Sequence, residues 1–309
     1  MKGYQMSNFF AKKKAIIAAV LFGVIFLILR LIQLENAVEY PSGFYAAGME
    51  LFNISFNILL VVSAAVIGVL AFLDCKNSDY KSIGKISVSG ASALGICMIL
   101  GGASMTVSVI SEFTNGLDFF SLFTIAGCAA YLAGGMIILA NGRITPPLCI
   151  SPIIIIIYYL LKCVEYYLAN PIITGMPQKL MLMLFYVVSV LFWINTGRLF
   201  SGIEKKLTRA AAVTSGLFTG VVACGYAIGG MLFAAVDGEK WLLLSDTADI
   251  ELAVTGFVPA IIAVILLCSK ARKGQKPADP EADLQQPEAA AFALDVAEEQ
   301  NDIDNISEN

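Results

Sequence analysis

The chain has 309 residues, of which 58% are apolar and only 14% are charged. Soluble domains are about 45–50% apolar and about 25% charged, so this composition excludes an ordinary soluble fold and places most of the chain in lipid. The sequence contains no histidine, which excludes histidine-based zinc sites, Ser-His or Cys-His nucleophile pairs and histidine proton relays.

Eight apolar runs have the length of a membrane span. A hydrocarbon core of about 30 Å requires roughly 20 residues of helix. The runs lack the period-two alternation of barrel strands, so helices are the only spanning structure that fits them. We therefore predict an all-α, polytopic transmembrane helical bundle. The predicted spans are Ala15–Leu34, Ile54–Leu73, Val88–Ile110, Phe119–Ala140, Leu148–Leu168, Leu180–Asn195, Ala211–Ala235 and Leu252–Leu267.

Basic residues predict the orientation of these spans. Lys12–Lys14 precede the first run, which is too long for a signal peptide and has no convincing cleavage site after it, so we expect an uncleaved span. Sixteen lysines and arginines fall in segments on the N-terminal side of the membrane, and only Lys179 and Lys240 fall in the opposite loops. By the positive-inside rule, both termini are cytoplasmic and the protein is a multi-pass component of the cell membrane.

A short part of the chain resembles a known group of proteins. Arg30-Leu-Ile-Gln33 in the first span is followed by the loop Tyr40-Pro-Ser-Gly-Phe-Tyr45. This arrangement resembles uncharacterised multi-spanning membrane proteins of Gram-positive anaerobes. The resemblance covers less than a tenth of the chain and implies a membrane location without an activity.

Three spans, the third, fourth and seventh, are rich in glycine, which lets helix backbones approach one another closely in lipid. We expect these three at the centre of the bundle. Seven cysteines are scattered without a C-x-x-C pair, which predicts free thiols rather than a disulfide framework.

The composition changes after Lys276. Residues 277–309 contain ten acidic residues and no basic residue, which is typical of a disordered tail. We therefore expect two parts, a transmembrane bundle over 1–276 and an acidic cytoplasmic tail over 277–309. The tail is either simply solvated or a docking segment for a protein partner. No basic stripe interleaved with aromatic residues is present, so nucleic-acid binding is not expected.

Four ionisable residues within or beside the spans form a candidate polar cavity in the outer half of the bundle: Arg30, Glu112, Lys162 and Glu165. Lys162 and Glu165 lie three residues apart on one helix face. Charged groups inside a membrane usually face protein or water, because exposure to lipid is costly. The tyrosines around the pair, Tyr158, Tyr159, Tyr166 and Tyr167, also fit an interfacial aromatic belt. The pair is therefore either an interface anchor or the lining of a cavity.

The sequence shows no catalytic, cofactor-binding or metal-binding motif, and no aspartate lies within a predicted span. We therefore expect a non-enzymatic membrane component, such as a sensor, a scaffold or a subunit of a complex, with no cofactor and with the lipid bilayer as its surroundings. The alternative is a small secondary transporter or channel, which the glycine-rich helices and the four outer charges favour.

Overall fold

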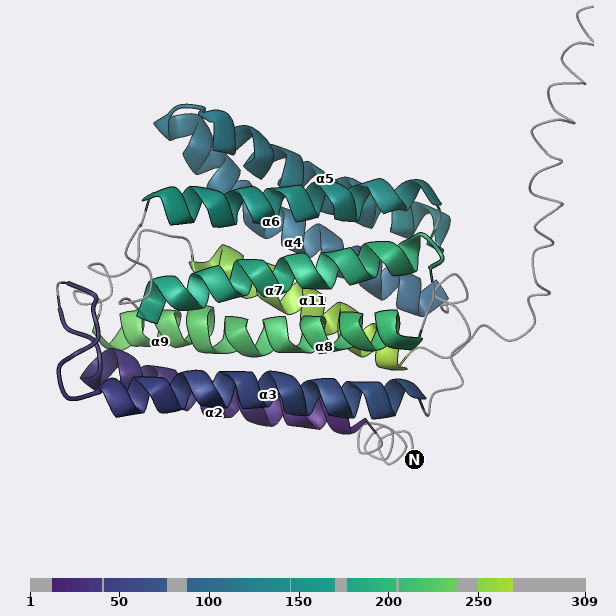
Figure 1. The fold of residues 1–309 in the computed structure, drawn as a ribbon. Coiled ribbons are helices and arrows are strands. Elements are labelled where there is room, and N and C mark those ends of the chain that lie inside the picture. Colours follow the sequence, from purple (N-terminus) through teal and green to yellow (C-terminus); the bar gives the residue numbers. More distant parts are fainter. Residues whose placement is uncertain are drawn as a thin grey trace, which may run out of the picture. The chain divides into compact units, whose positions relative to one another are not determined.

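Figure 1 shows the fold as a computed structural model, which describes residues 13–40, 42–76, 88–144, 146–169, 177–203, 206–237 and 249–268. All of them belong to one unit, Met1–Ala271. The predicted tail, its boundary at Lys276 and its docking role lie outside the described residues and stay predictions.

The described residues fold into helices that cross the bundle in alternating directions (Figure 1). Eight of them are long and apolar enough to span a membrane, which confirms the predicted fold class. The elements are α2 (Lys14–Asn36), α3 (Glu50–Lys76), α4 (Val88–Asn115), α5 (Phe119–Asn141), η2 (Pro146–Cys149), α6 (Ile150–Ala169), α7 (Pro177–Phe200), α8 (Lys206–Ala223), the π-helix η3 (Cys224–Ile228), α9 (Gly229–Val236) and α11 (Asp249–Cys268).

Six spans pack into a closed ring. Neighbours in the order α4, α5, α6, α7, α8 and α11 contact each other, and α11 returns to α4. The remaining pair, α2 and α3, packs against α8 and its continuation, on one side of the ring (Figure 1). The seventh span, made of α8, η3 and α9, therefore touches both parts and is the most deeply buried of the eight.

Glycine sets how closely these spans approach. A methyl group added at Gly135 of α5 would lie 2.7 Å from the carbonyl oxygen of Gly95 on α4. A methyl group at Gly216 of α8 would lie 2.6 Å from the carbonyl oxygen of Pro259 on α11. The prediction that glycine-rich spans are central is confirmed for the seventh span, whereas α4 and α5 are less buried than α7 and α11.

The two shortest predicted spans begin earlier than the apolar pattern predicts. α7 begins at Pro177 rather than Leu180, and α11 begins at Asp249 rather than Leu252. Both extensions contain polar side chains that face protein instead of water, such as Gln178 and Glu251, which are 4% and 7% exposed. All seven cysteines are free thiols, as predicted.

Candidate functional site

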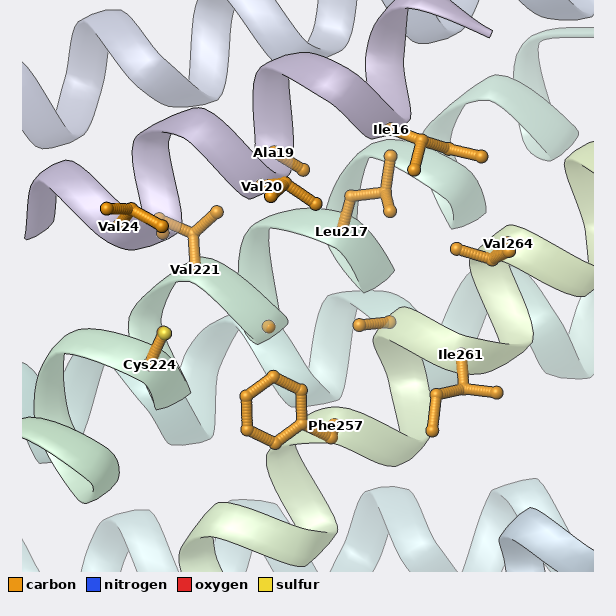
Figure 2. A pocket seen from close by; sticks show the side chains of 13 residues that line it. Ile16, Ala19, Val20, Val24, Leu217, Val221, Cys224, Phe257, Ile261 and Val264 are labelled. Atoms are coloured by element: carbon orange, nitrogen blue, oxygen red, sulfur yellow. The ribbon is translucent and has the colours of Figure 1, made fainter. Parts of the chain in front are cut away.

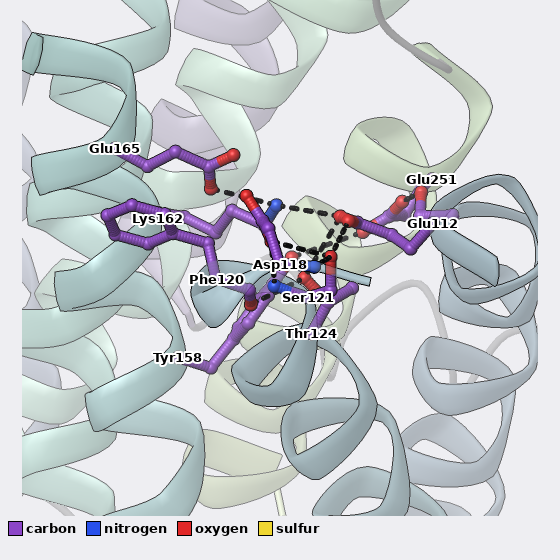
Figure 3. A network of polar contacts seen from close by, with 10 residues as sticks. Glu112, Asp118, Phe120, Ser121, Thr124, Tyr158, Lys162, Glu165 and Glu251 are labelled. Atoms are coloured by element: carbon purple, nitrogen blue, oxygen red, sulfur yellow. Dashed lines mark hydrogen bonds and ion pairs between the residues drawn. The ribbon is translucent and has the colours of Figure 1, made fainter. Parts of the chain in front are cut away.

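Lys162 is the centre of an ion-paired cluster that joins two spans (Figure 3). Its Nζ lies 3.1 Å from Oε1 of Glu112 on α4 and 3.0 Å from Oε2 of Glu165 one turn further along α6. The side chains of Lys162 and Glu112 are only 18% and 22% exposed. The structure therefore brings together three of the four residues of the predicted cavity, and the Lys162–Glu112 ion pair links two different helices, α6 and α4.

Hydroxyl groups of α5 hold the other side of Glu112. Ser121 Oγ donates to Glu112 Oε2 and also lies 2.6 Å from Oδ1 of Asp118, the residue that caps α5. Thr124 Oγ1 lies 3.3 Å from Glu112 Oε1. A serine hydroxyl carries one proton, so it cannot donate fully to two ionised carboxylates at once. The Ser121 hydroxyl therefore donates to one of the two carboxylates at a time, while the backbone N–H of Ser121 donates to Asp118.

Glu251 at the start of α11 completes the cluster (Figure 3). Ser108 of α4 donates to its Oε2, and the phenol of Tyr158 lies 3.2 Å from its Oε1. Glu251 is close enough to Lys162 and Glu112 for their charges to interact. We call the set Glu112, Lys162, Glu165 and Glu251, with the hydroxyls of Ser108, Ser121 and Tyr158, the acid-rich site.

The predicted last span, Leu252–Leu267, does not include Glu251, but Glu251 is a buried helical residue. Of the two alternatives for the tyrosines, burial favours the cavity lining over the interfacial belt at Tyr158 and Tyr159, which are 4% and 1% exposed. Of the four tyrosines around the Lys162–Glu165 pair, Tyr167 at the end of α6 is the one that is largely exposed, at 56%.

A second, short chain of hydrogen bonds lies in the ring beside the acid-rich site, where the Tyr158 and Tyr159 rings are in contact. Tyr158 is followed on α6 by Tyr159, whose hydroxyl lies 3.1 Å from that of Tyr131 on α5. Trp193 of α7 donates its Nε1–H to the same Tyr131 hydroxyl over 3.1 Å. Polar groups from three spans are therefore linked inside a largely aromatic interior.

Arg30, the fourth predicted residue, is not part of this site. It is fully buried between α2, α3, α7 and the seventh span, where it donates to the side-chain oxygens of Gln33 and Gln178. Gln33 in turn donates to Oδ1 of Asn53 on α3 over 2.8 Å. The structure thus contains two separate polar clusters, and Arg30 does not reach the interface by extending its side chain outward.

The cap of α5 gives a pH-dependent prediction outside the membrane spans. Hydrogen bonds from the side chain and backbone N–H of Ser121 hold the pKa of Asp118 below its ordinary value of 3.8. A lowered pKa contributes stability that is present above the ordinary value and is lost as the pH falls through the folded one. We expect Asp118→Asn to lower the melting temperature slightly at pH 7 and to lower it less near pH 3. Thermal melts of both proteins across this range, with Glu39→Gln as an exposed control, measure the difference; an equal loss at pH 3 would contradict it.

An apolar pocket of about 360 Å³ lies among α2, α8 and α11, away from both polar clusters (Figure 2). Phe257 and Ile261 of α11 line one side of it, and Val20 and Val24 of α2 line another. Its lining is almost entirely hydrocarbon. In the part of the chain that the structure describes, no three His, Cys, Asp or Glu side chains are grouped as a metal site.

Comparison with known proteins identifies no relative. No family model, no curated protein and no solved structure matches the chain.

Proposed function

We propose that this membrane protein is a small secondary transporter whose acid-rich site binds and releases a proton during transport. The observation that carries the proposal is that three glutamates from three different spans lie near one lysine, two of them in ion pairs with it and Glu251 close enough for its charge to interact. This favours the transporter alternative over a sensor, scaffold or complex subunit, because a purely structural bundle has no need of this excess of acid.

The charge balance of the site supports proton binding. If all three glutamates were ionised, the site would carry three negative charges against the one positive charge of Lys162. Burying an unpaired charge in a low-dielectric interior carries a desolvation penalty on the order of several kcal/mol per ion. One proton on Glu251 relieves most of this cost, because Glu251 is buried and its side-chain partners are the neutral hydroxyls of Ser108 and Tyr158.

The position of the site supports transport rather than catalysis. Ionisable residues inside membrane proteins commonly mark the pathways of ions and substrates. Here Tyr158 and Tyr159 extend the polar groups from the acid-rich site toward Tyr131 and Trp193 in the ring. A non-enzymatic role also agrees with the absence of a catalytic motif from the sequence. We further propose the orientation given by the basic residues, with both termini in the cytoplasm of the cell that carries the protein.

The experiment that tests this function uses purified protein in liposomes loaded with a pH-sensitive dye. Pools of amino acids, sugars and small organic acids are added under an inward proton gradient. We expect at least one pool to acidify the interior faster than protein-free liposomes do. Glu251→Gln, which mimics a permanently protonated side chain, should abolish the acidification but keep exchange of labelled solute across the membrane, because exchange does not require release of the proton.

The matched control is Glu39→Gln, the same chemical change at an exposed position in the loop between α2 and α3. It should transport as the wild type does. Solute uptake that ignores the proton gradient would refute proton coupling, and absence of uptake from every pool would favour the non-transporting class instead.

A further inference from the structure

Arg30 is a buried cation whose hydrogen-bond partners, among the described residues, are neutral amides. Its side chain is fully buried, and its two terminal nitrogens donate to the amide oxygens of Gln33 and Gln178. Gly229 of the seventh span allows this burial, since a methyl group there would lie 3.0 Å from Cγ of Arg30. Most buried arginines in proteins are paired with a carboxylate or a phosphate, so these surroundings require an explanation.

The chemistry of arginine fixes the direction of every bond in the cluster. A guanidinium can only donate, so it is the oxygen of each glutamine amide, and not the NH₂ group, that contacts it. The NH₂ group of Gln33 is satisfied by Asn53. Two buried donors are left without a hydrogen-bond partner within the described residues, Arg30 Nε and Gln178 Nε2. These two donors belong to side chains that are hydrogen-bonded to each other. The cluster therefore has more hydrogen-bond donors than acceptors, and it also has an unneutralised positive charge.

No described neighbour supplies the missing negative charge. No carboxylate of the described segments lies within ion-pair distance of Arg30. The titratable groups that act on it are tyrosines, among them Tyr40 and Tyr45 of the adjoining loop. Burial raises the pKa of Tyr40 to about 12 and also raises that of Tyr45, so both are neutral phenols at physiological pH. Glu35 and Asp237 act on Tyr40, at the edge of the cluster.

We propose that the Arg30 cluster binds a small monovalent anion, such as chloride or the carboxylate group of a small organic acid. The anion accepts hydrogen bonds from Arg30 Nε and Gln178 Nε2 and neutralises the guanidinium. A water molecule can accept the same hydrogen bonds but cannot offset the charge. The site is defined by equilibrium binding, so it does not depend on the transport function proposed above.

The first test is the melting temperature of the detergent-purified full chain in sodium chloride, sodium formate and sodium gluconate at equal ionic strength. We expect chloride and formate to raise it in a saturable way relative to gluconate, which is too large to enter a buried cluster. A ligand that binds only the native state raises stability as its concentration passes the dissociation constant. Arg30→Gln should abolish the rise, whereas Arg198→Gln, which removes an exposed positive charge, should keep it.

A second variant and a second measurement keep the test decisive if Arg30→Gln does not fold. Gln178→Leu removes one of the two donors and should raise the half-saturating chloride concentration by about tenfold, which is the loss of one hydrogen bond to a charged group. Bromide soaked into crystals of the wild type should give an anomalous peak beside the Arg30 guanidinium. No saturable difference between chloride and gluconate in the wild type, an unchanged response in Gln178→Leu, or density for water only would overturn the proposal.

Discussion

Replacing Gly135 with alanine is expected to destabilise the bundle severely. The added methyl group would lie 2.7 Å from the Gly95 carbonyl oxygen and 3.0 Å from the backbone nitrogen of Ile99. Both are backbone atoms of α4, so they can move only if the whole helix moves. Forcing extra volume into a well-packed contact costs about 1–3 kcal/mol. We expect the upper end of this range, because the two backbone clashes remain even if the Ile99 side chain rotates away.

Gly23→Ala is the matched control for this change. Gly23 also lies in the middle of a spanning helix, but the nearest atom to an added methyl group is Cys224 Sγ at 3.7 Å, an ordinary van der Waals distance. Alanine is a better helix former than glycine by about 1 kcal/mol, so this variant should be as stable as the wild type or slightly more stable. Thermal melts in detergent measure both variants. Equal behaviour of the two would mean that α4 and α5 do not approach as closely as described.

Neutralising Lys162 alone is expected to be the most damaging single change in the acid-rich site. Lys162→Met leaves Glu112 and Glu165 without their shared cation, and breaking a buried ion pair by removing one partner costs about 3–5 kcal/mol. The low end applies here, because the two side chains of the interhelical pair are 18% and 22% exposed. Combining Lys162→Met with Glu112→Gln should restore part of the lost stability.

A double-mutant cycle on the free energy of unfolding measures the coupling energy between Lys162 and Glu112. We expect about 1–3 kcal/mol between Lys162 and Glu112, the range found for contacting charged residues. The pair Lys162 and Glu165 is the internal comparison. It lies within one helix and Glu165 is 34% exposed, so its coupling should be about 0.2–0.5 kcal/mol. A coupling near zero for Lys162 and Glu112 would show that the lysine extends toward the membrane surface instead of pairing across the bundle.

The spans were predictable because lipid imposes a single requirement on each of them, a run of about 20 apolar residues. The same requirement explains the errors. Glu251 and Gln178 are polar residues at span ends, and apolar length alone cannot tell a helix that continues through a buried polar contact from a loop that begins there. The π-helix Cys224–Ile228 was not predicted, since nothing in its Gly-rich, apolar composition distinguishes it from α-helix.

The ion pairs and hydrogen bonds between helices could not be predicted from the sequence, for a different reason. Lys162 and Glu112 are 50 residues apart, and Glu165 is the only partner of Lys162 that helical spacing could identify. Arg30 was correctly singled out as a charge inside a span, but its neighbour Gln178 lies 148 residues away. A single sequence shows that a charged residue lies within a span, but it does not show which residue from another span binds that charge.

That separation also constrains how the protein is made. Arg30 enters the membrane with the first helix, near the C-terminal end of α2, at an insertion cost below the roughly 2.5–3.5 kcal/mol of a charge at the helix centre. At roughly 5–20 residues per second, the ribosome needs roughly 7–30 s to reach Gln178 and longer to reach Gly229. During this interval only Gln33 and Asn53, carried by the α2–α3 hairpin itself, are available to solvate the cluster. The hairpin therefore carries its own temporary polar shell, and a nascent chain without these two amides would have to hold a bare arginine in lipid until the sixth span arrives.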